Sequence, residues 1–188
     1  MTTPLNPPDW KPLTLATVSF GHSISVSLLH LARAYSILTN GGFDVKPTII
    51  KKNEDQDIRK RIFKRETSHK ILELLEAVVS DERGTGRSAN SAYYGIGGKT
   101  GTADKPSKKN KGYLEERVIS NFAGVFPIGE PRYVIAALLD EPENTFKEKT
   151  CRFSGCTVAP MVKKIIERVA PLLGIMPFKS HEENRVDS

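Results

Sequence analysis

The sequence has few cysteines, no long apolar run and no metal-binding pattern. Only two of its 188 residues are cysteines, Cys151 and Cys156, and they lie five positions apart. They form no C-x-x-C pair, and no set of cysteines and histidines has metal-ligand spacing, so neither a metal nor a cofactor is predicted. The spacing leaves open whether the two cysteines form a local disulfide or stay as free thiols. The longest strongly apolar run, 133–139, is far shorter than the roughly 20 residues that cross a bilayer.

The length and composition are those of one globular domain. A chain of 188 residues can bury about 70% of its unfolded surface, so it needs no disulfide or metal for stability. The net charge of +6 is compatible with an anionic partner and requires none. The first residues, MTTPLNPPDWKP, lack the charged start and apolar core of a secretory signal, so no such signal is predicted.

Three helices are predicted from apolar periodicity and capping signals. The first runs from about Ser27, a capping residue, to about Asn40, where Gly41 and Gly42 supply the left-handed stop. The second begins at a Thr67-Ser68 cap, buries Ile71, Leu74, Leu75, Val78 and Val79, and ends near Arg83. The third has Pro160 in its first turn and ends before Pro171.

Strands are predicted at 94–104, 117–126 and 132–140, and PIGEPR at 127–132 is a hairpin turn between the last two. Residues 43–50 are predicted as a short strand or extended stretch, at an edge because they contain Pro47. Because helices flank antiparallel hairpins instead of alternating with parallel strands, the predicted fold class is α+β.

The segment YYGIGGKTGTADKP at 93–106 contains a G-K-T triplet that resembles the end of a phosphate-binding loop. That loop requires a glycine five residues before Gly98, where this chain has Tyr93. It must also lead directly into a helix, whereas Thr100 is followed by a glycine and soon by Pro106. The phosphate-loop interpretation therefore fails on both counts.

The same segment makes chemical sense as a β-strand. Alternation places Thr100 and Thr102 on one face and Lys99 and Gly101 on the other. Two hydroxyls and the backbone N–H groups of a strand edge can bind a carboxylate or a carbonyl oxygen. The lysine ammonium adds a gross attraction of about 4 kcal/mol at about 4 Å and an effective dielectric constant of about 20, less the cost of desolvation. A hairpin strand with an incidental lysine is the alternative that these residues alone leave open.

Longer segments resemble the transpeptidase domain of class B penicillin-binding proteins. Lys99-Thr100-Gly101-Thr102 matches the K-T-G signature of the penicillin-binding protein and serine β-lactamase superfamily. SFGHSISVSLLHLARAYSILTNGG (19–42) is similar to the family's F-G-x-x-I-S-V-T-P-L-Q-L-A-x-A-Y-x-x-L-A-N-G-G, and VVSDERGTGRSA (78–89) to its V-V-x-x-x-G-T-G-x-x-A turn. Residues 120–142 and 158–175 resemble the hairpin and the closing helix that follow.

The resemblance implies a peptidoglycan D,D-transpeptidase, which cross-links cell-wall stem peptides through a serine acyl-enzyme and is blocked by β-lactam antibiotics. It implies an antiparallel sheet flanked by helices, of the penicillin-binding protein and serine β-lactamase type. In the full-length protein we expect the periplasmic face of the bacterial inner membrane, divisome partners and the septal type, with the elongation type left open. Lys99 would shape the electrostatics around the serine cluster, the hydroxyls of Thr100 and Thr102 would bind the ligand carboxylate, and the Thr102 N–H would join the oxyanion hole.

The family's nucleophile motif, S-x-x-K, does not occur in residues 1–188. The nearest imitation, Thr67-Ser68-His69-Lys70, has threonine in the first position. Ser88-Ala89-Asn90 spells the second family motif, S-x-N, but it lies in the turn before the strand, whereas the family's motif belongs to a separate loop. We interpret it as a coincidence. A third departure is the segment Cys151-Arg152-Phe153-Ser154-Gly155-Cys156, which stands where relatives usually carry a Gly-Trp or Gly-Thr pair.

The predicted organisation is therefore an incomplete fold that lacks the serine-bearing part. Residues 1–13 form an extended proline-rich lead-in, 14–175 the C-terminal portion of a transpeptidase domain, and 176–188 a polar tail. The missing N-terminal part of the same protein would be a partner of this portion. The alternative is a non-catalytic binding or regulatory module that retains the K-T-G strand. An in-frame S-x-x-K and S-x-N in the upstream coding sequence would exclude it.

Two basic clusters raise the question of an anionic polymer as a partner. The charged segment 51–66 also contains Glu54, Asp55 and Asp57, so it is interpreted as a solvated connection, and no nucleic acid is predicted. Four lysines follow the K-T-G motif: Lys105, Lys108, Lys109 and Lys111. Such a cluster at a hairpin tip is typical of a solvated face, with binding of an anionic polymer as the alternative.

Labelling by penicillin tests the absence of the nucleophile. Because an acyl-enzyme requires an activated serine, the 188-residue chain should form no covalent adduct with a fluorescent penicillin. The measurement is in-gel fluorescence after denaturing electrophoresis, with an intact class B penicillin-binding protein as the positive control. A fluorescent band from this chain that disappears after heat denaturation would contradict the prediction.

Overall fold

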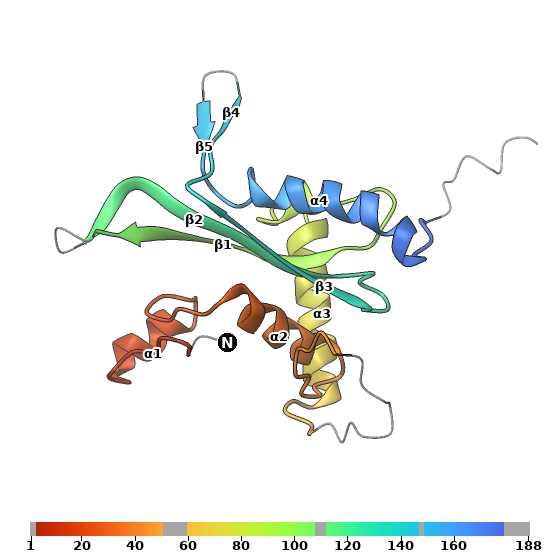
Figure 1. The fold of residues 1–188 in the computed structure, drawn as a ribbon, viewed down its shortest axis with the longest axis horizontal. Helices are drawn as coiled ribbons and strands as arrows, with labels where there is room; N and C mark the ends of the chain where they lie inside the picture. The colour runs from red at the N-terminus through yellow and green to blue at the C-terminus, as the bar shows by residue number, and fades with distance from the viewer. Residues whose placement is uncertain (1–2, 51–59, 108–111, 147–148, 179–188) are drawn as a thin grey trace, which may run out of the picture.

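The computed structural model describes residues 3–50, 60–107, 112–146 and 149–178. Its central feature is a three-stranded antiparallel sheet with helices on both faces (Figure 1), which confirms the predicted α+β class. The helices are α1 (Pro12–Val18), α2 (Leu28–Thr39), α3 (Arg65–Ser80) and α4 (Val158–Val169), with short 3-10 helices at Arg87–Ala89 and Pro171–Leu173. The strands are β1 (Gly97–Pro106), β2 (Tyr113–Phe126), β3 (Tyr133–Asp140), β4 (Asn144–Phe146) and β5 (Lys149–Cys151).

The sheet has the order β1-β2-β3, so β2 is its central strand. Thr100 of β1 lies opposite Phe122 of β2, and Thr102 lies opposite Ser120. The hairpin turn predicted at 127–132 is confirmed, since β2 ends at Phe126 and β3 begins at Tyr133. The first predicted strand begins later than expected, at Gly97, and the Gly95 carbonyl before it accepts the Ile128 N–H of the turn between β2 and β3.

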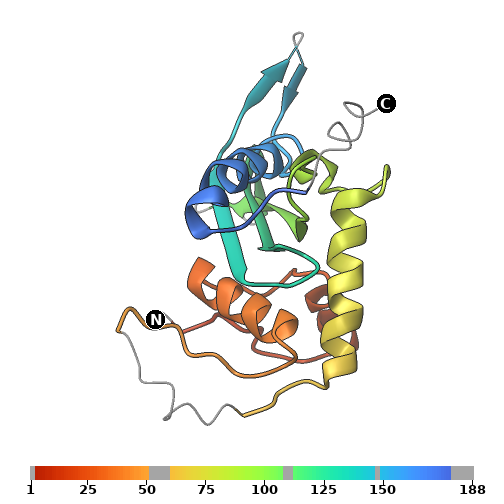
Figure 2. The ribbon, with the colours of Figure 1, turned by 90° about the vertical axis from the view of Figure 1, so that its right-hand side faces the viewer.

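Helix α4 covers one face of the sheet, and α2 lies against the other (Figure 1). Helix α3 runs past both layers beside the sheet (Figure 2). The main core lies between α4 and the sheet, where Phe122, Val158, Val162 and Ile166 have no exposed surface. None of the described helices combines the length and the apolar character that crossing a membrane requires.

Helix α2 has the boundaries that its sequence predicts. Ser27 is the N-cap, and its side-chain oxygen accepts the His30 N–H at 3.3 Å. Gly41 and Gly42 follow the helix with φ angles of 85° and 89°, in the left-handed region that glycine adopts without strain.

Helix α3 differs from its prediction in start, end and buried face. It begins at Arg65 instead of at a Thr67-Ser68 cap, and it ends at Ser80 instead of near Arg83. Ser68 is buried because its hydroxyl donates to the Leu38 carbonyl at 2.6 Å and accepts the Gly41 N–H at 3.0 Å. It therefore joins α3 to the end of α2. Leu74, predicted to be buried, is 63% exposed.

Three further segments differ from the sequence prediction. Helix α1, with proline in its first turn, makes residues 12–13 of the expected extended lead-in helical. Residues 43–50, predicted as a short strand or an extended stretch, are not a strand and make a single bridge from Phe43 to Arg61, and 51–59 of the charged connection lie outside the described residues. The β4–β5 hairpin was not predicted.

The chain end is described only as far as Phe178, whose N–H donates to the Tyr93 carbonyl. Residues 179–188 of the predicted polar tail lie outside the described part.

Lys105 joins the ends of two non-adjacent strands. Its ammonium lies 2.8 Å from an Asp140 carboxylate oxygen and 2.7 Å from one of Glu141. These hydrogen bonds, Asp140 first and Glu141 second, raise the pKa of Lys105, and the bond from Lys105 lowers the pKa of Glu141. Lys105, predicted as part of a solvated lysine cluster, is partly exposed and paired with two carboxylates, while Lys108, Lys109 and Lys111 lie outside the described residues.

Replacing Ser68 by alanine tests the link between α2 and α3. The change leaves the Leu38 carbonyl and the Gly41 N–H without their partner, which should lower the free energy of unfolding by about 1–3 kcal/mol. Thr67→Ala, one residue away and exposed, is the matched control and should change it by less than about 0.5 kcal/mol. Urea unfolding followed by circular dichroism measures both, and equal values for the two variants would contradict the assigned link.

A pH titration tests the ion cluster at the end of β1. Because the pKa of Glu141 is lowered in the fold, its contribution to stability is present above the ordinary value of 4.5 and is lost as the pH falls through the folded value. The pKa of Lys105 is raised in the fold, so its contribution to stability is present below the ordinary value of 10.5. That contribution is lost as the pH rises through the folded value. Lys105→Met should move the NMR-detected pKa of Glu141 up toward 4.5. Lys164→Met, on α4, is the control, and an unchanged Glu141 titration in Lys105→Met would exclude the cluster.

Candidate functional site

The K-T-G residues lie on β1, one of the two edge strands of the sheet. The side chains of Thr100 and Thr102 line one hollow of about 420 Å³. Its other lining residues come from the turn after α3 and from the segment before α4: Thr85, Cys151, Phe153, Ser154, Gly155 and Cys156. The two hydroxyls thus share a face, as strand alternation predicts.

Lys99 is exposed at the edge of β1 and bends toward its neighbour. Its ammonium donates to the Thr100 carbonyl at 2.9 Å and to the Thr100 hydroxyl oxygen at 3.3 Å. The structure therefore brings the lysine charge to Thr100 and leaves Thr102 without a contact to it.

The outer edge of β1 offers backbone groups beside these side chains. In the described part of the chain, β1 pairs only with β2, so its other edge has no strand partner. The Thr100 carbonyl points toward this outer edge, because it accepts a hydrogen bond from the Lys99 ammonium. In an antiparallel ladder the N–H and C=O of one residue point to the same side of the strand. The residue two positions further along points to that side as well. The Thr102 N–H therefore points outward, as the Thr100 carbonyl does.

Thr100 is held from the turn that follows α3. Its hydroxyl donates to the Thr85 hydroxyl oxygen at 2.8 Å. Thr85 lies in the Gly84-Thr85-Gly86 turn, where the Gly86 N–H bonds back to the Val78 carbonyl. The sequence motif located this turn but gave no role to Thr85, because a contact across 15 residues depends on how α3 packs beside the sheet.

Thr102 is held from the segment before α4. Its hydroxyl oxygen accepts the Ser154 N–H at 3.1 Å and lies 3.5 Å from the Ser120 hydroxyl. Ser154 in turn donates its own hydroxyl to the Asn121 carbonyl at 2.6 Å. The only signal for Ser154 in the sequence was its place between the two cysteines.

Gly101 leaves room for a side chain of the neighbouring strand. A Cβ atom at this position would lie 2.7 Å from the Asn121 amide oxygen. Gly101 therefore allows Asn121 to approach closely, on the face opposite Thr100 and Thr102.

The cysteine question is settled by the structure, in which Cys151 and Cys156 form a disulfide. The bond connects the end of β5 with the segment that leads into α4, next to the hollow lined by Thr100 and Thr102.

The other sequence candidates lie away from this hollow. Ser88 and Asn90 flank the buried Ala89 and are not among its lining residues. The imitation Thr67-Ser68-His69-Lys70 lies in the first turns of α3. Among the described residues, no group of three histidine, cysteine or acidic side chains is placed to hold a metal.

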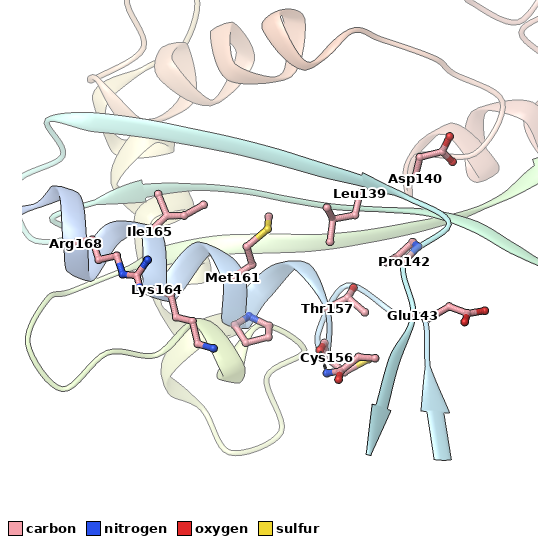
Figure 3. A pocket seen from close by; sticks show the side chains of 12 residues that line it. Leu139, Asp140, Pro142, Glu143, Cys156, Thr157, Met161, Lys164, Ile165 and Arg168 are labelled. Atoms are coloured by element: carbon pink, nitrogen blue, oxygen red, sulfur yellow. Dashed lines mark hydrogen bonds between the residues drawn. The ribbon is translucent and has the colours of Figure 1, made fainter. Parts of the chain in front are cut away.

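A larger hollow of about 620 Å³ lies on the α4 side of the sheet (Figure 3). It is lined by Leu139 and Asp140 at the end of β3, by Met161 and Ile165 of α4, and by neighbouring residues. It contains none of the K-T-G side chains, and Cys156 is the residue that it shares with the smaller hollow. The smaller hollow is therefore the candidate site, because it contains the Thr100 and Thr102 side chains of the K-T-G strand.

Curated relatives match the chain over most of its length. A probable peptidoglycan D,D-transpeptidase FtsI of Caulobacter vibrioides is 36% identical over 179 residues, which cover 92% of this chain and 30% of that protein. A probable peptidoglycan D,D-transpeptidase PenA of Neisseria meningitidis is 35% identical, with 90% of this chain and 28% of that protein covered. Stage V sporulation protein D of Bacillus subtilis is 35% identical, with 93% and 27% covered. The chain thus spans less than a third of the length of these relatives.

Solved structures show the same fold. The transpeptidase domain of penicillin-binding protein 3 from Burkholderia pseudomallei superposes with a TM-score of 0.80 at 32% identity, and the match covers 92% of this chain and 50% of that one. Penicillin-binding protein 3 of Mycobacterium tuberculosis in complex with aztreonam gives a TM-score of 0.79 at 26% identity, with 95% and 42% covered.

The family model for the penicillin-binding protein transpeptidase domain matches residues 2–167. This match includes the K-T-G strand, the turn that holds Thr100 and the segment that holds Thr102. The chain therefore belongs to the penicillin-binding protein transpeptidase domain family.

Proposed function

We propose that the chain is the C-terminal portion of a peptidoglycan D,D-transpeptidase, and that the outer edge of β1 holds the carboxylate end of the stem peptide. The observation that carries the proposal is the placement of the Thr100 and Thr102 side chains in one hollow, with the Lys99 ammonium hydrogen-bonded to Thr100. A carboxylate is an acceptor with two oxygens. The Thr102 hydroxyl, a Thr100 hydroxyl that turns its proton from Thr85 to the ligand, and the nearby Lys99 cation would match its chemistry.

The relatives support the same ligand class. Those of Caulobacter vibrioides and Neisseria meningitidis carry the name peptidoglycan D,D-transpeptidase, and the protein of Mycobacterium tuberculosis has been solved with aztreonam and with ampicillin. Both the peptide substrate and these antibiotics present an anionic group beside a carbonyl, so one site serves both. For this chain, β-lactam binding is proposed as non-covalent, with covalent binding confined to a complete domain.

The role of β1 is to bind and orient the ligand. The outward Thr102 N–H would donate to the ligand carbonyl as part of the oxyanion hole, and donors of this kind typically contribute about 10²–10³ in rate. The nucleophile would come from the N-terminal part of the full-length protein, because residues 1–188 contain no S-x-x-K. That part, septal cell-division partners and a periplasmic location at the inner membrane belong to the proposal for the full-length protein.

Binding of a dipeptide with and without its carboxylate tests the proposal. N-acetyl-D-alanyl-D-alanine should shift the NMR signals of the Thr100 and Thr102 amides, while its C-terminal amide should bind more weakly. Thr100→Val and Thr102→Val each remove a hydroxyl donor to a charged acceptor, worth about 1.5–3 kcal/mol, so each should weaken binding of the acid roughly 10- to 100-fold.

Thr48→Val, an exposed position remote from β1, is the matched control and should bind as the wild type does. Equal affinity for the acid and the amide, or shifts that avoid β1, would exclude a carboxylate site at this strand.

A further inference from the structure

A short loop closed by the disulfide lies directly against the candidate site. This segment, Cys151 to Cys156, is called the cystine loop below. Both cysteines and the residues between them, apart from Arg152, line the hollow that contains Thr100 and Thr102. The loop connects the end of β5 with the start of α4, so two elements of the fold meet in it.

The cystine loop is bonded to both strands that form the site. The Ser154 N–H donates to the Thr102 hydroxyl oxygen of β1, and the Ser154 hydroxyl donates to the Asn121 carbonyl of β2. The Arg152 carbonyl accepts the Ser120 hydroxyl of β2 at 2.7 Å. Ser154 is 1% exposed, so these bonds are shielded from competing water.

The loop also approaches the turn that holds Thr100. A Cβ atom on Gly155 would lie 2.7 Å from the Thr85 carbonyl oxygen, so this position has room for glycine alone. Thr85 in turn accepts the Thr100 hydroxyl. The position of the cystine loop is therefore coupled to both threonines of the site.

The bond from Ser154 determines what the Thr102 hydroxyl can do. A threonine hydroxyl has one proton to donate and two lone pairs that accept. Because the Ser154 N–H occupies a lone pair, it orients the oxygen and leaves the proton available for a donated bond. Ser120, at 3.5 Å, is a distant acceptor, so a ligand carboxylate in the hollow is a stronger one.

We propose that the Cys151–Cys156 disulfide is a positioning device for Thr102 that makes carboxylate binding at β1 sensitive to reduction; the ligand class rests on the proposed function. With the disulfide closed, the bond ties the two ends of the loop together between β5 and α4, and the Ser154 N–H stays hydrogen-bonded to the Thr102 hydroxyl oxygen. With the disulfide open, the loop ends move independently and the Thr102 hydroxyl loses its orientation. Both cysteines are only partly buried and line the hollow, so a small dithiol reaches them.

The redox step is a thiol–disulfide exchange. An external dithiol gives up two electrons and two protons and becomes a disulfide, while Cys151 and Cys156 accept them and become two thiols. No other oxidant or reductant takes part.

The experiment compares the oxidised chain, the chain reduced with dithiothreitol, and the double variant Cys151→Ser/Cys156→Ser with and without dithiothreitol. Two NMR measurements are made on each sample, well below its unfolding temperature. The first is the hydrogen-exchange rate of the Ser154 amide, which needs no ligand. The second is the ratio of affinities for N-acetyl-D-alanyl-D-alanine and for its C-terminal amide.

Reduction should speed exchange of the Ser154 amide at least tenfold and lower the acid-to-amide affinity ratio several-fold. The double variant should match the reduced chain and should not respond to dithiothreitol. Thr102→Val in the oxidised chain should also speed exchange of the Ser154 amide, because it removes the acceptor.

Each other result is decisive. If reduction leaves the acid-to-amide affinity ratio unchanged, the disulfide contributes to stability alone and the positioning role is overturned. This holds even if reduction lowers the melting temperature. If the reduced chain unfolds, the disulfide is needed for stability, and the positioning role is likewise overturned. If neither dipeptide binds the oxidised chain, the proposed function fails, and the carboxylate role of the disulfide fails with it. If the double variant does not fold, the reduced wild-type chain carries the test.

Discussion

The burial of Phe122 between the sheet and α4 is the constraint on which the candidate site depends. Phe122 has no exposed surface, and a Cβ atom on Gly98 would overlap its ring, so the neighbouring strand is shaped to accept it. In an antiparallel pair, a slip of one residue would turn every side chain to the opposite face. Because Phe122 must face α4, Thr100, which lies opposite it, faces the same side, and Thr102 follows two residues later.

The position of α4 then determines what covers these threonines. The segment that enters α4 must cross the sheet from β5, and it does so over Ser120, Asn121 and Thr102. Buried polar groups in such a crossing need partners, and the serine side chains provide them. The site is thus held by hydrogen bonds from the same segment that closes the core.

Under the proposed function, the chain supplies the surface that binds the substrate, while the nucleophile would come from another part of the full-length protein. Catalysis by covalent intermediates needs a nucleophile at a defined distance from the groups that bind the substrate. Lys99, Thr100 and Thr102 are arranged on one rigid strand, whereas the S-x-x-K serine is not among residues 1–188. Binding and bond-making elements that come from distant parts of a sequence can be separated in this way, because each is positioned by its own secondary structure.

The sequence by itself determined features that depend on neighbours along the chain. These are the Ser27 cap and glycine stop of α2, the turn between β2 and β3, and the shared face of Thr100 and Thr102, since each follows from local conformation. Only the tertiary structure decided that Ser68 joins α2 to α3 and that Ser154 holds Thr102. It also paired Cys151 with Cys156 and Lys105 with Asp140. Most of these contacts join residues 27 to 52 positions apart, and even the short cysteine pair depends on where β5 meets α4, so no local pattern specifies them.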